Sequence, residues 1–341
     1  ITVNSVDGGI FAGVNGPGAS DDATGVNIAN VDAAIVVLIP KSSTDKRRWI
    51  SAVGTGGTAG IKGISDVTLQ ATGLSLLVNQ PMGKTSSGAV NTSLVDFAAN
   101  PLSVQMSDGS TVRVEHSAAA GPQLILSGTA DISFSDFFRV NGNIGVRKTT
   151  YDLQLSDGTT TPSNLLTIGG SGLSAFAGVN PGTADAAGLS LSGVNFAFVS
   201  ATDKLDASRR WNTLQATAAS VAALGIPDVT ISGTNLAVTI NRPDLNGVVA
   251  SYSATPLSVP VGGGQNYQIN LNGASGALLE ASGDLTVTVS DFFRVSGSFG
   301  LRRAAANVTL ADGTTADVTL LTLGIEDRKS TRLNSSHIPL S

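Results

Sequence analysis

Residues 151–160 read YDLQLSDGTT, and this arrangement of alternating apolar residues followed by a turn recurs along the chain. Tyr151, Leu153 and Leu155 alternate with polar residues and lead into an Asp-Gly pair. A period of two places every other side chain on one face of a strand. Asp-Gly readily adopts the positive φ that tight hairpin turns need. The stretch therefore predicts two antiparallel strands joined by a short turn, and an all-β fold.

The sequence contains one unit twice. Four short motifs of the first half return in the second: FAGVN (11–15 and 176–180), RRW (47–49 and 209–211), SDFFRV (135–140 and 290–295) and LLTxG (165–169 and 320–324). The shift falls from 165 through 162 to 155 residues, which places short deletions in loops and leaves the strands in register. We therefore predict two β-repeat copies, residues 1–169 and 170–326.

Composition agrees with a strand-rich chain. Of 341 residues only 13% are charged, 40 are Gly and none is Cys, so disulfide scaffolds, zinc–thiolate sites and cysteine nucleophiles are excluded. The segment with the best helical pattern, residues 214–224 (LQATAASVAAL), has a counterpart at 51–61 that is rich in Gly and Thr, so we predict strands for both. The apolar run at 33–39 (AAIVVLI) is too short to span a bilayer and predicts a buried strand.

Two all-β architectures fit these strands. The first is an elongated antiparallel meander, solenoid-like, in which tandem repeats stack and cover one another's sheet edges. The second is a pair of tandem β-sandwich domains. Glycines near the middle of several long strands predict bulges or bends in either case. We favour the meander.

The two ends of the chain differ from the rest. Residues 327–341 (DRKSTRLNSSHIPLS) resemble a translated sequencing adapter, so we expect a non-native, disordered tail, and the start at Ile1 indicates a truncated reading frame. Leaving out this tail, with its three basic residues and one acidic residue, gives a net charge of −7. An acidic chain with dispersed cations disfavours nucleic-acid binding, and we expect no membrane insertion.

Catalytic signals are weak. His116 is the one imidazole before residue 327, the chain has no GxSxG motif, and the counterpart of His116 in the second copy is Leu271. A position that accepts Leu is used for packing, so we predict that the protein is not an enzyme. An enzyme module would require a deep pocket with converging Asp side chains or His116.

The clearest candidates for ligand binding are two copies of an Arg-Arg-Trp motif: Arg47, Arg48, Trp49, Arg209, Arg210 and Trp211. Trp stacks on sugars or cations and Arg binds carboxylates, which would make a ligand platform. The alternative is a strand entry in which Trp anchors in the core and the arginines stay solvated.

A weak Ca²⁺ site is the one cofactor the sequence suggests. Asp21 and Asp22 are adjacent in the loop GPGASDDATG (residues 16–25), but the corresponding second-copy loop keeps only Asp185. Calcium sites need several converging oxygen ligands, and no EF-hand loop or calcium-binding nonapeptide is present.

FAGVN, GLSLSGVNFAFV (188–199), SDFFRV and ADGTTADVTLLTLG (311–324) resemble the repeat regions of giant bacterial secreted or cell-surface proteins of adhesin type. The resemblance implies a structural or adhesive module, a stalk or surface-presentation unit, whose partners are neighbouring repeats of the same parent chain and surface glycans. From the composition of the chain we expect a secreted or cell-surface location in a bacterium. The alternative function is a β-groove that binds lipid or polysaccharide, and an apolar lining exposed to solvent would favour it.

Overall fold

The computed structural model describes residues 2–6, 9–14, 23–64, 67–106, 108–134, 137–290 and 293–330. Within these ranges the chain forms strands and two short 3₁₀ turns, and no α-helix. The strands are β1 (Thr2–Val6), β2 (Gly9–Val14), β3 (Thr24–Leu38), β4 (Lys46–Lys62), β5 (Val67–Lys84), β6 (Leu102–Gln105), β7 (Thr111–Val114), β8 (Gln123–Phe134), β9 (Phe138–Leu155), β10 (Thr160–Val179), β11 (Ala187–Asp203), β12 (Arg210–Leu224), β13 (Val229–Arg242), β14 (Ala250–Ser251), β15 (Leu257–Gly262), β16 (Gln265–Ile269), β17 (Leu278–Val289), β18 (Phe293–Thr309) and β19 (Thr315–Ser330). The turns are η1 (Ala118–Ala120) and η2 (Gly273–Ser275). A membrane-crossing helix is absent from the same ranges.

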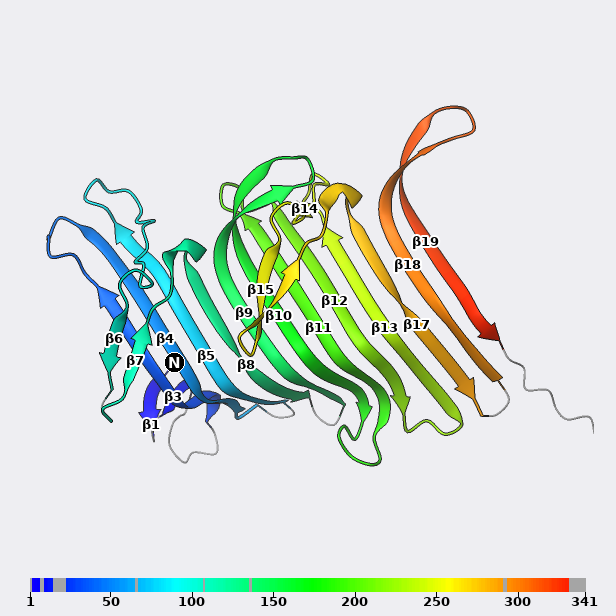
Figure 1. Cartoon of the computed structure of the whole chain (residues 1–341), viewed down its shortest axis with the longest axis horizontal. Coiled ribbons are helices and arrows are strands. Elements are labelled where there is room, and N and C mark those ends of the chain that lie inside the picture. The colour runs from blue at the N-terminus through cyan, green and yellow to red at the C-terminus, as the bar shows by residue number, and fades with distance from the viewer. Residues whose placement is uncertain are drawn as a thin grey trace, which may run out of the picture.

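Fifteen strands form one antiparallel sheet in the order β1-β2-β3-β4-β5-β8-β9-β10-β11-β12-β13-β17-β18-β19, with the short β14 beside β9 (Figure 1). Along this path each strand pairs with its neighbours in the chain, apart from two insertions. The all-β class and the elongated antiparallel meander are therefore confirmed. The sheet neither closes nor curls, so the solenoid-like form and the two separate sandwiches are both wrong. The reason is that, among the described residues, no strand of the meander crosses to a second sheet.

The two insertions are the hairpins β6–β7 and β15–β16, each a separate two-stranded sheet. They follow equivalent strands, β5 and β13, and in Figure 1 they lie in front of the large sheet. The two copies thus have the same order of elements. Their predicted boundary at residue 170 falls inside β10, so the copies share a strand and continue as one sheet.

The end of β19 includes part of the predicted non-native tail. Asp327 pairs with Gly297 and Lys329 pairs with Ser296, so the first four residues of the adapter-like segment continue β19 beside β18. The boundary expected at residue 326 is not the end of the strand. Residues 331–341 lie outside the described residues.

Bends occur in the middle of the long strands, as their glycines predict. Gly73 and its second-copy counterpart Asn235 have φ values of 58° and 56°, and Asn30 and its counterpart Gly193 have 57° and 59°. Gly and Asn are the residues that adopt this left-handed conformation at low cost. The pairing register shifts beside Gly73 and Asn235, which marks β-bulges. Glycine and asparagine thus exchange between copies because both satisfy the same backbone requirement.

The core lies between the sheet and the two hairpins. Under β15–β16, Trp211, Tyr252 and Ile269 have no exposed surface, and burial raises the pKa of Tyr252 to about 12. A smaller cluster under β6–β7 contains Phe97 and Val114. Each hairpin therefore supplies the second apolar layer that one face of the sheet needs.

The structure corrects the prediction that residues 33–39 form a buried strand. Residues 33–38 form the end of β3, where Ala34 is buried within the smaller cluster. Ile35 and Val37 point to the other side and are 68% and 58% exposed. This part of β3 is therefore buried on one face only, because the other face of the sheet has no second layer in the described chain.

Candidate functional site

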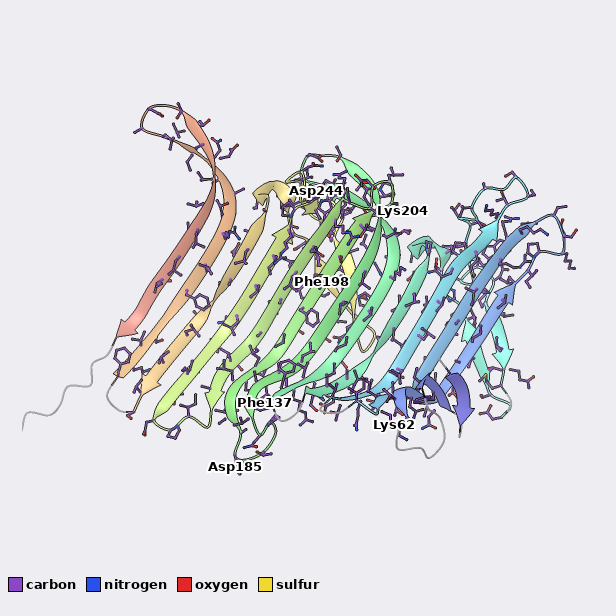
Figure 2. The ribbon with its side chains drawn as sticks, turned by 180° about the vertical axis from the view of Figure 1, so that it is seen from behind. Lys62, Phe137, Asp185, Phe198, Lys204 and Asp244 are labelled. Carbon is purple, nitrogen blue, oxygen red and sulfur yellow. The ribbon has the colours of Figure 1, made fainter. Side chains whose placement is uncertain are left out.

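The sheet has two different faces. We call the face that carries the hairpins the hairpin face, and the other the open face. Along β11 the register places Leu189, Leu191, Val194, Phe196 and Phe198 on the open face. The view from behind shows this face with no segment of the described chain across it, and Phe198 is labelled near its centre (Figure 2).

The apolar character of the open face continues across the sheet. The cross-strand partners of Phe198 are Ile168 and Leu214, and Leu214 pairs in turn with Ile240. The open-face apolar residues that are more than one-third exposed are Val26, Ile35, Val37, Met82, Leu124, Leu126, Phe138, Leu166, Val179, Leu189, Val238, Leu279, Leu285, Val289, Phe293, Val295, Leu321, Leu323 and Ile325. We call this set, with the β11 residues, the open apolar face. It reaches from β3 to β19.

The hairpin face is polar along the part of β11 that no hairpin covers. In β11 Ser190 and Ser192 alternate with the apolar residues, and the Ser192 hydroxyl lies 2.7 Å from that of Ser220 on β12. Hydroxyls of this kind are satisfied by one another and by water. These hydroxyls therefore need no covering layer, whereas no second layer of the described chain covers the apolar side chains of the open face.

Basic residues lie on the open face towards the strand ends that adjoin the Arg-Arg-Trp motifs. We call them the basic rim: Lys46, Arg48, Lys84, Lys148, Arg210, Arg242 and Arg303. The register places Lys148 opposite Leu124 and Leu166, and Arg303 opposite Leu279 and Leu321, so cations border the open apolar face directly. In the described residues none of the seven forms a salt bridge. Lys46, Arg48 and Arg210 donate to backbone carbonyl oxygens instead, so no carboxylate of the described chain neutralises the charges of the rim.

The Arg-Arg-Trp motif of the second copy divides between the two faces. Trp211 has no exposed surface, and its Nε1 donates to the carbonyl oxygen of Val248 at 3.1 Å. The Arg209 guanidinium lies 5.0 Å from the Trp211 ring centre and donates to Asp244 at 2.9 Å, which raises the pKa of Arg209. Arg210 points to the open face. A ligand platform on Trp211 does not fit, because the hairpin segment already covers the ring.

The first copy repeats this division. Trp49 is half-buried and its Nε1 donates to the Ser93 carbonyl oxygen at 2.9 Å, while the Arg47 guanidinium lies 5.2 Å from the Trp49 ring centre. Arg47 also pairs with Asp45 at 2.7 Å. Arg48 points to the open face. The structure thus brings one arginine of each motif to the basic rim, and the Trp of each motif anchors an insertion. Arg209 also anchors an insertion through Asp244, whereas Arg47 pairs within the β3–β4 connection.

His116 lies beside the smaller core cluster. Its Nε2 is 3.2 Å from the Ser51 hydroxyl, and its ring meets that of Phe97 edge-on at 5.2 Å. The Nδ1 atom is buried without a hydrogen-bond partner, so no third group orients the ring as a triad would require. Burial lowers the pKa of His116 from its ordinary value of 6.5, against a smaller opposing effect of the Asp96 charge.

The lowered pKa gives a pH prediction for the β6–β7 insertion. The folded state holds His116 neutral, so its contribution is complete above the unfolded-state pKa of 6.5 and is lost as pH falls through the lower folded-state value. We expect the amide protection factors of β6–β7, which correct for the pH dependence of intrinsic exchange, to fall below about pH 6.5. His116→Leu, which copies Leu271, should remove this dependence. An unchanged pH profile in the variant would assign the effect to another group.

The metal prediction falls outside what the structure describes. Asp21 and Asp22 are not among the described residues, and Asp185 lies in an exposed loop (Figure 2). Within the described ranges no cluster of three or more His, Asp or Glu side chains is arranged to hold a metal ion.

The open apolar face and its basic rim are the features of the described chain that no internal contact accounts for. Comparisons of the chain with protein-family models, with curated proteins and with solved structures gave no match.

Proposed function

We propose that the repeat sheet is a binding surface for anionic lipids, whose acyl chains lie on the open apolar face and whose head groups meet the basic rim. The observation that carries the proposal is the open apolar face itself. Apolar patches on monomeric proteins rarely exceed a few hundred Å², and larger ones mark ligand or partner surfaces. This face spans strands from β3 to β19 without a covering layer.

The chemistry of the face favours lipid over polysaccharide. Leu, Val and Ile predominate among the exposed residues, with Phe138 and Phe293 at the strand ends away from the rim. Sugar sites combine stacked aromatic rings with polar side chains that form hydrogen bonds, whereas the rings in the middle of this face, Phe196 and Phe198, have apolar cross-strand neighbours such as Ile168 and Leu214. Acyl chains need only apolar area. The unpaired cations at the border add a site for phosphate or carboxylate.

The second candidate is the structural or adhesive module of an exported bacterial protein. The continuous pairing of the two copies through β10 favours it, because repeats joined in this way act as one rigid unit. A secreted or cell-surface location is part of that candidate. A stalk role gives no reason for an uncovered apolar face, so we place it second.

The test measures binding of phosphatidylglycerol with a fluorescent acyl chain, with fluorescent phosphatidylcholine as the zwitterionic comparison. Leu189→Thr/Val238→Thr/Leu285→Thr replaces exposed apolar side chains with a β-forming polar residue. We expect this triple variant to bind both lipids about 10-fold or more weakly, because each order of magnitude requires about 1.4 kcal/mol of lost contact. Arg210→Gln/Arg242→Gln/Arg303→Gln should lose the preference for phosphatidylglycerol and keep the binding of acyl chains.

The matched control is Leu205→Thr/Leu245→Thr, which removes two loop leucines that are 84% and 86% exposed and lie off the sheet. It should bind as the unchanged chain does. Far-UV circular dichroism confirms that each variant keeps its strands. Equal loss in the control and the face variant, or no binding of either lipid by the unchanged chain, would contradict the proposal.

A further inference from the structure

Hairpin β15–β16 crosses the junction between the two copies. β15 lies against β8, β9 and β10, and β16 lies against β11. Two of these strands, β8 and β9, belong to the first copy, although the hairpin itself belongs to the second. The hairpin therefore fastens one copy to the preceding one.

Two glycines make this contact possible. Gly145 on β9 and Gly169 on β10 are cross-strand partners on the hairpin face. A Cβ atom at either position would lie 2.5 Å from the carbonyl oxygen of Pro260 in β15, well inside van der Waals contact. The backbone of the hairpin thus sits directly on this glycine pair, and only glycine allows so close an approach.

An equivalent glycine pair, which we call the seat, lies near the other end of the chain. Gly300 on β18 and Gly324 on β19 are the counterparts of Gly145 and Gly169, 155 residues on, and they are again cross-strand partners. A Cβ atom at Gly300 would meet nothing within 4 Å, and one at Gly324 would meet only the Gly300 carbonyl oxygen at 3.9 Å. Neither conformation requires glycine, since neither φ is positive. The described chain therefore gives no internal reason for this glycine pair.

The complementary hairpin projects from the opposite end. In β15, Leu257 and Val259 are 2% and 0% exposed. Their first-copy counterparts are Leu102, which is 39% exposed, and Val104, which is half-buried. The hairpin β6–β7 is held by β3 and β4 through β7, as β16 is held by β11, but strands like β8 and β9 are absent beneath β6 within the described residues.

From this juxtaposition we propose that a second copy of this chain docks end to end: hairpin β6–β7 of one molecule seats on the Gly300–Gly324 pair of the next. The contact repeats the one that β15 makes within the chain. It goes beyond lipid binding and does not depend on it, because the seat lies on the hairpin face.

The strand edges support the same arrangement. In the described residues β2 pairs with β3 only over Thr24 to Ala29, so the outer edge from Val31 to Leu38 carries no partner strand. The equivalent part of β11 pairs with β10. The outer edge of β19 is also free within the described chain. An edge of this kind readily accepts another strand, and β19 of one molecule would pair with β3 of the next as β10 pairs with β11.

One segment competes with this docking. β2 occupies on the lower half of β3 the place that the end of β10 occupies on β11. A second molecule must displace β2 to pair along the whole of β3. Association of the full chain should therefore be weaker than association of a variant that lacks residues 1–14.

Sedimentation velocity over a range of concentrations tests the proposal. We expect the full chain to form oligomers that grow with concentration, and deletion of residues 1–14 to tighten association. Gly300→Val/Gly324→Val should weaken association about 10-fold or more, because the added side chains fill the seat. Leu102→Asp, which places a charge on the projecting hairpin, should act in the same direction.

Leu323→Thr is the matched control, since Leu323 lies beside Gly324 on the same strand but on the open face. Association that survives the glycine variant and is lost in Leu323→Thr would show that molecules meet through their open faces, and it would overturn the end-to-end arrangement. A full chain and deletion variant that both stay monomeric up to their solubility limit would overturn it as well. Lipid binding by the glycine variant should be unchanged, which separates this test from that of the proposed function.

Discussion

Trp211→Ala is expected to lower the free energy of unfolding by about 3–5 kcal/mol, the usual cost of removing a fully buried large aromatic side chain. The indole has no exposed surface and packs within the cluster under β15–β16. Its loss also leaves the Val248 carbonyl oxygen without the donor that holds the insertion to β12. Urea denaturation followed by far-UV circular dichroism measures the change, and amide exchange should show that β15–β16 opens first.

Trp49→Ala is the internal comparison for this experiment. The motif is the same, but Trp49 is half-buried and its cluster is smaller. The cost should be clearly less than for Trp211→Ala, because less apolar surface leaves the core. Equal costs at the two positions would mean that burial by the hairpin does not set the contribution of the motif.

Gly169→Ala is expected to destabilise the chain by about 1–3 kcal/mol, the usual cost of overpacking, and to detach hairpin β15–β16 from the sheet. The new methyl group would lie 2.5 Å from the Pro260 carbonyl oxygen and 2.7 Å from a methyl group of Val261. A backbone atom cannot rotate away as a side chain can, so the hairpin itself must shift. Amide exchange in β15 and β16 measures this directly.

Gly324→Ala is the control on the equivalent position. The nearest atom to its added Cβ is 3.9 Å away, so the stability of the single molecule should be unchanged. A matching loss of stability at Gly324 would show that glycine is needed there for the strand and not for a docked hairpin.

The sequence predicted the sheet well because hairpin signals are local. The alternation around Tyr151 and Leu155, and the Asp-Gly turn between them and β10, depend on residues that are near in the chain. The repeat motifs likewise predicted equivalent strands in the two copies. Gly193 and Asn30 occupy equivalent positions with a positive φ. The glycines in the middle of the strands predicted bends of this type.

The sequence did not predict what covers each face. Alternation states that one side of a strand is apolar, and we expected that side to be a closed interior. In β11 the apolar phase of Phe196 and Phe198 belongs to the open face, while Ala197 and Val199 form the core on the other. In a strand that is apolar on both faces, the sequence pattern does not show which face is buried. The uncovered face could therefore be recognised only from the positions of the hairpins.

The sequence did not predict the basic rim, for a related reason. Arg48 and Arg210 were selected with their neighbours as one platform, yet a strand sends adjacent side chains to opposite faces. Lys148 and Arg303, two further rim residues, lie at equivalent positions of the two copies, 155 residues apart. Neither belongs to a recognisable motif. Their repetition was the signal available, and only the sheet register brings them into one row.

The order of strands has a consequence for how the chain folds. Apart from the two insertions, each strand pairs with the next one in the chain, so the sheet can assemble progressively from the N-terminal strands during synthesis, with little loop-closure entropy at each step. The exceptions are the short β14, which pairs with β9, and hairpin β15–β16, which reaches back to β8 across strands β9 to β13. The seating of hairpin β15–β16 is therefore the slow, non-local event, and a ribosome-bound chain that stops before residue 257 should hold the sheet from β1 to β13 with an unfinished core.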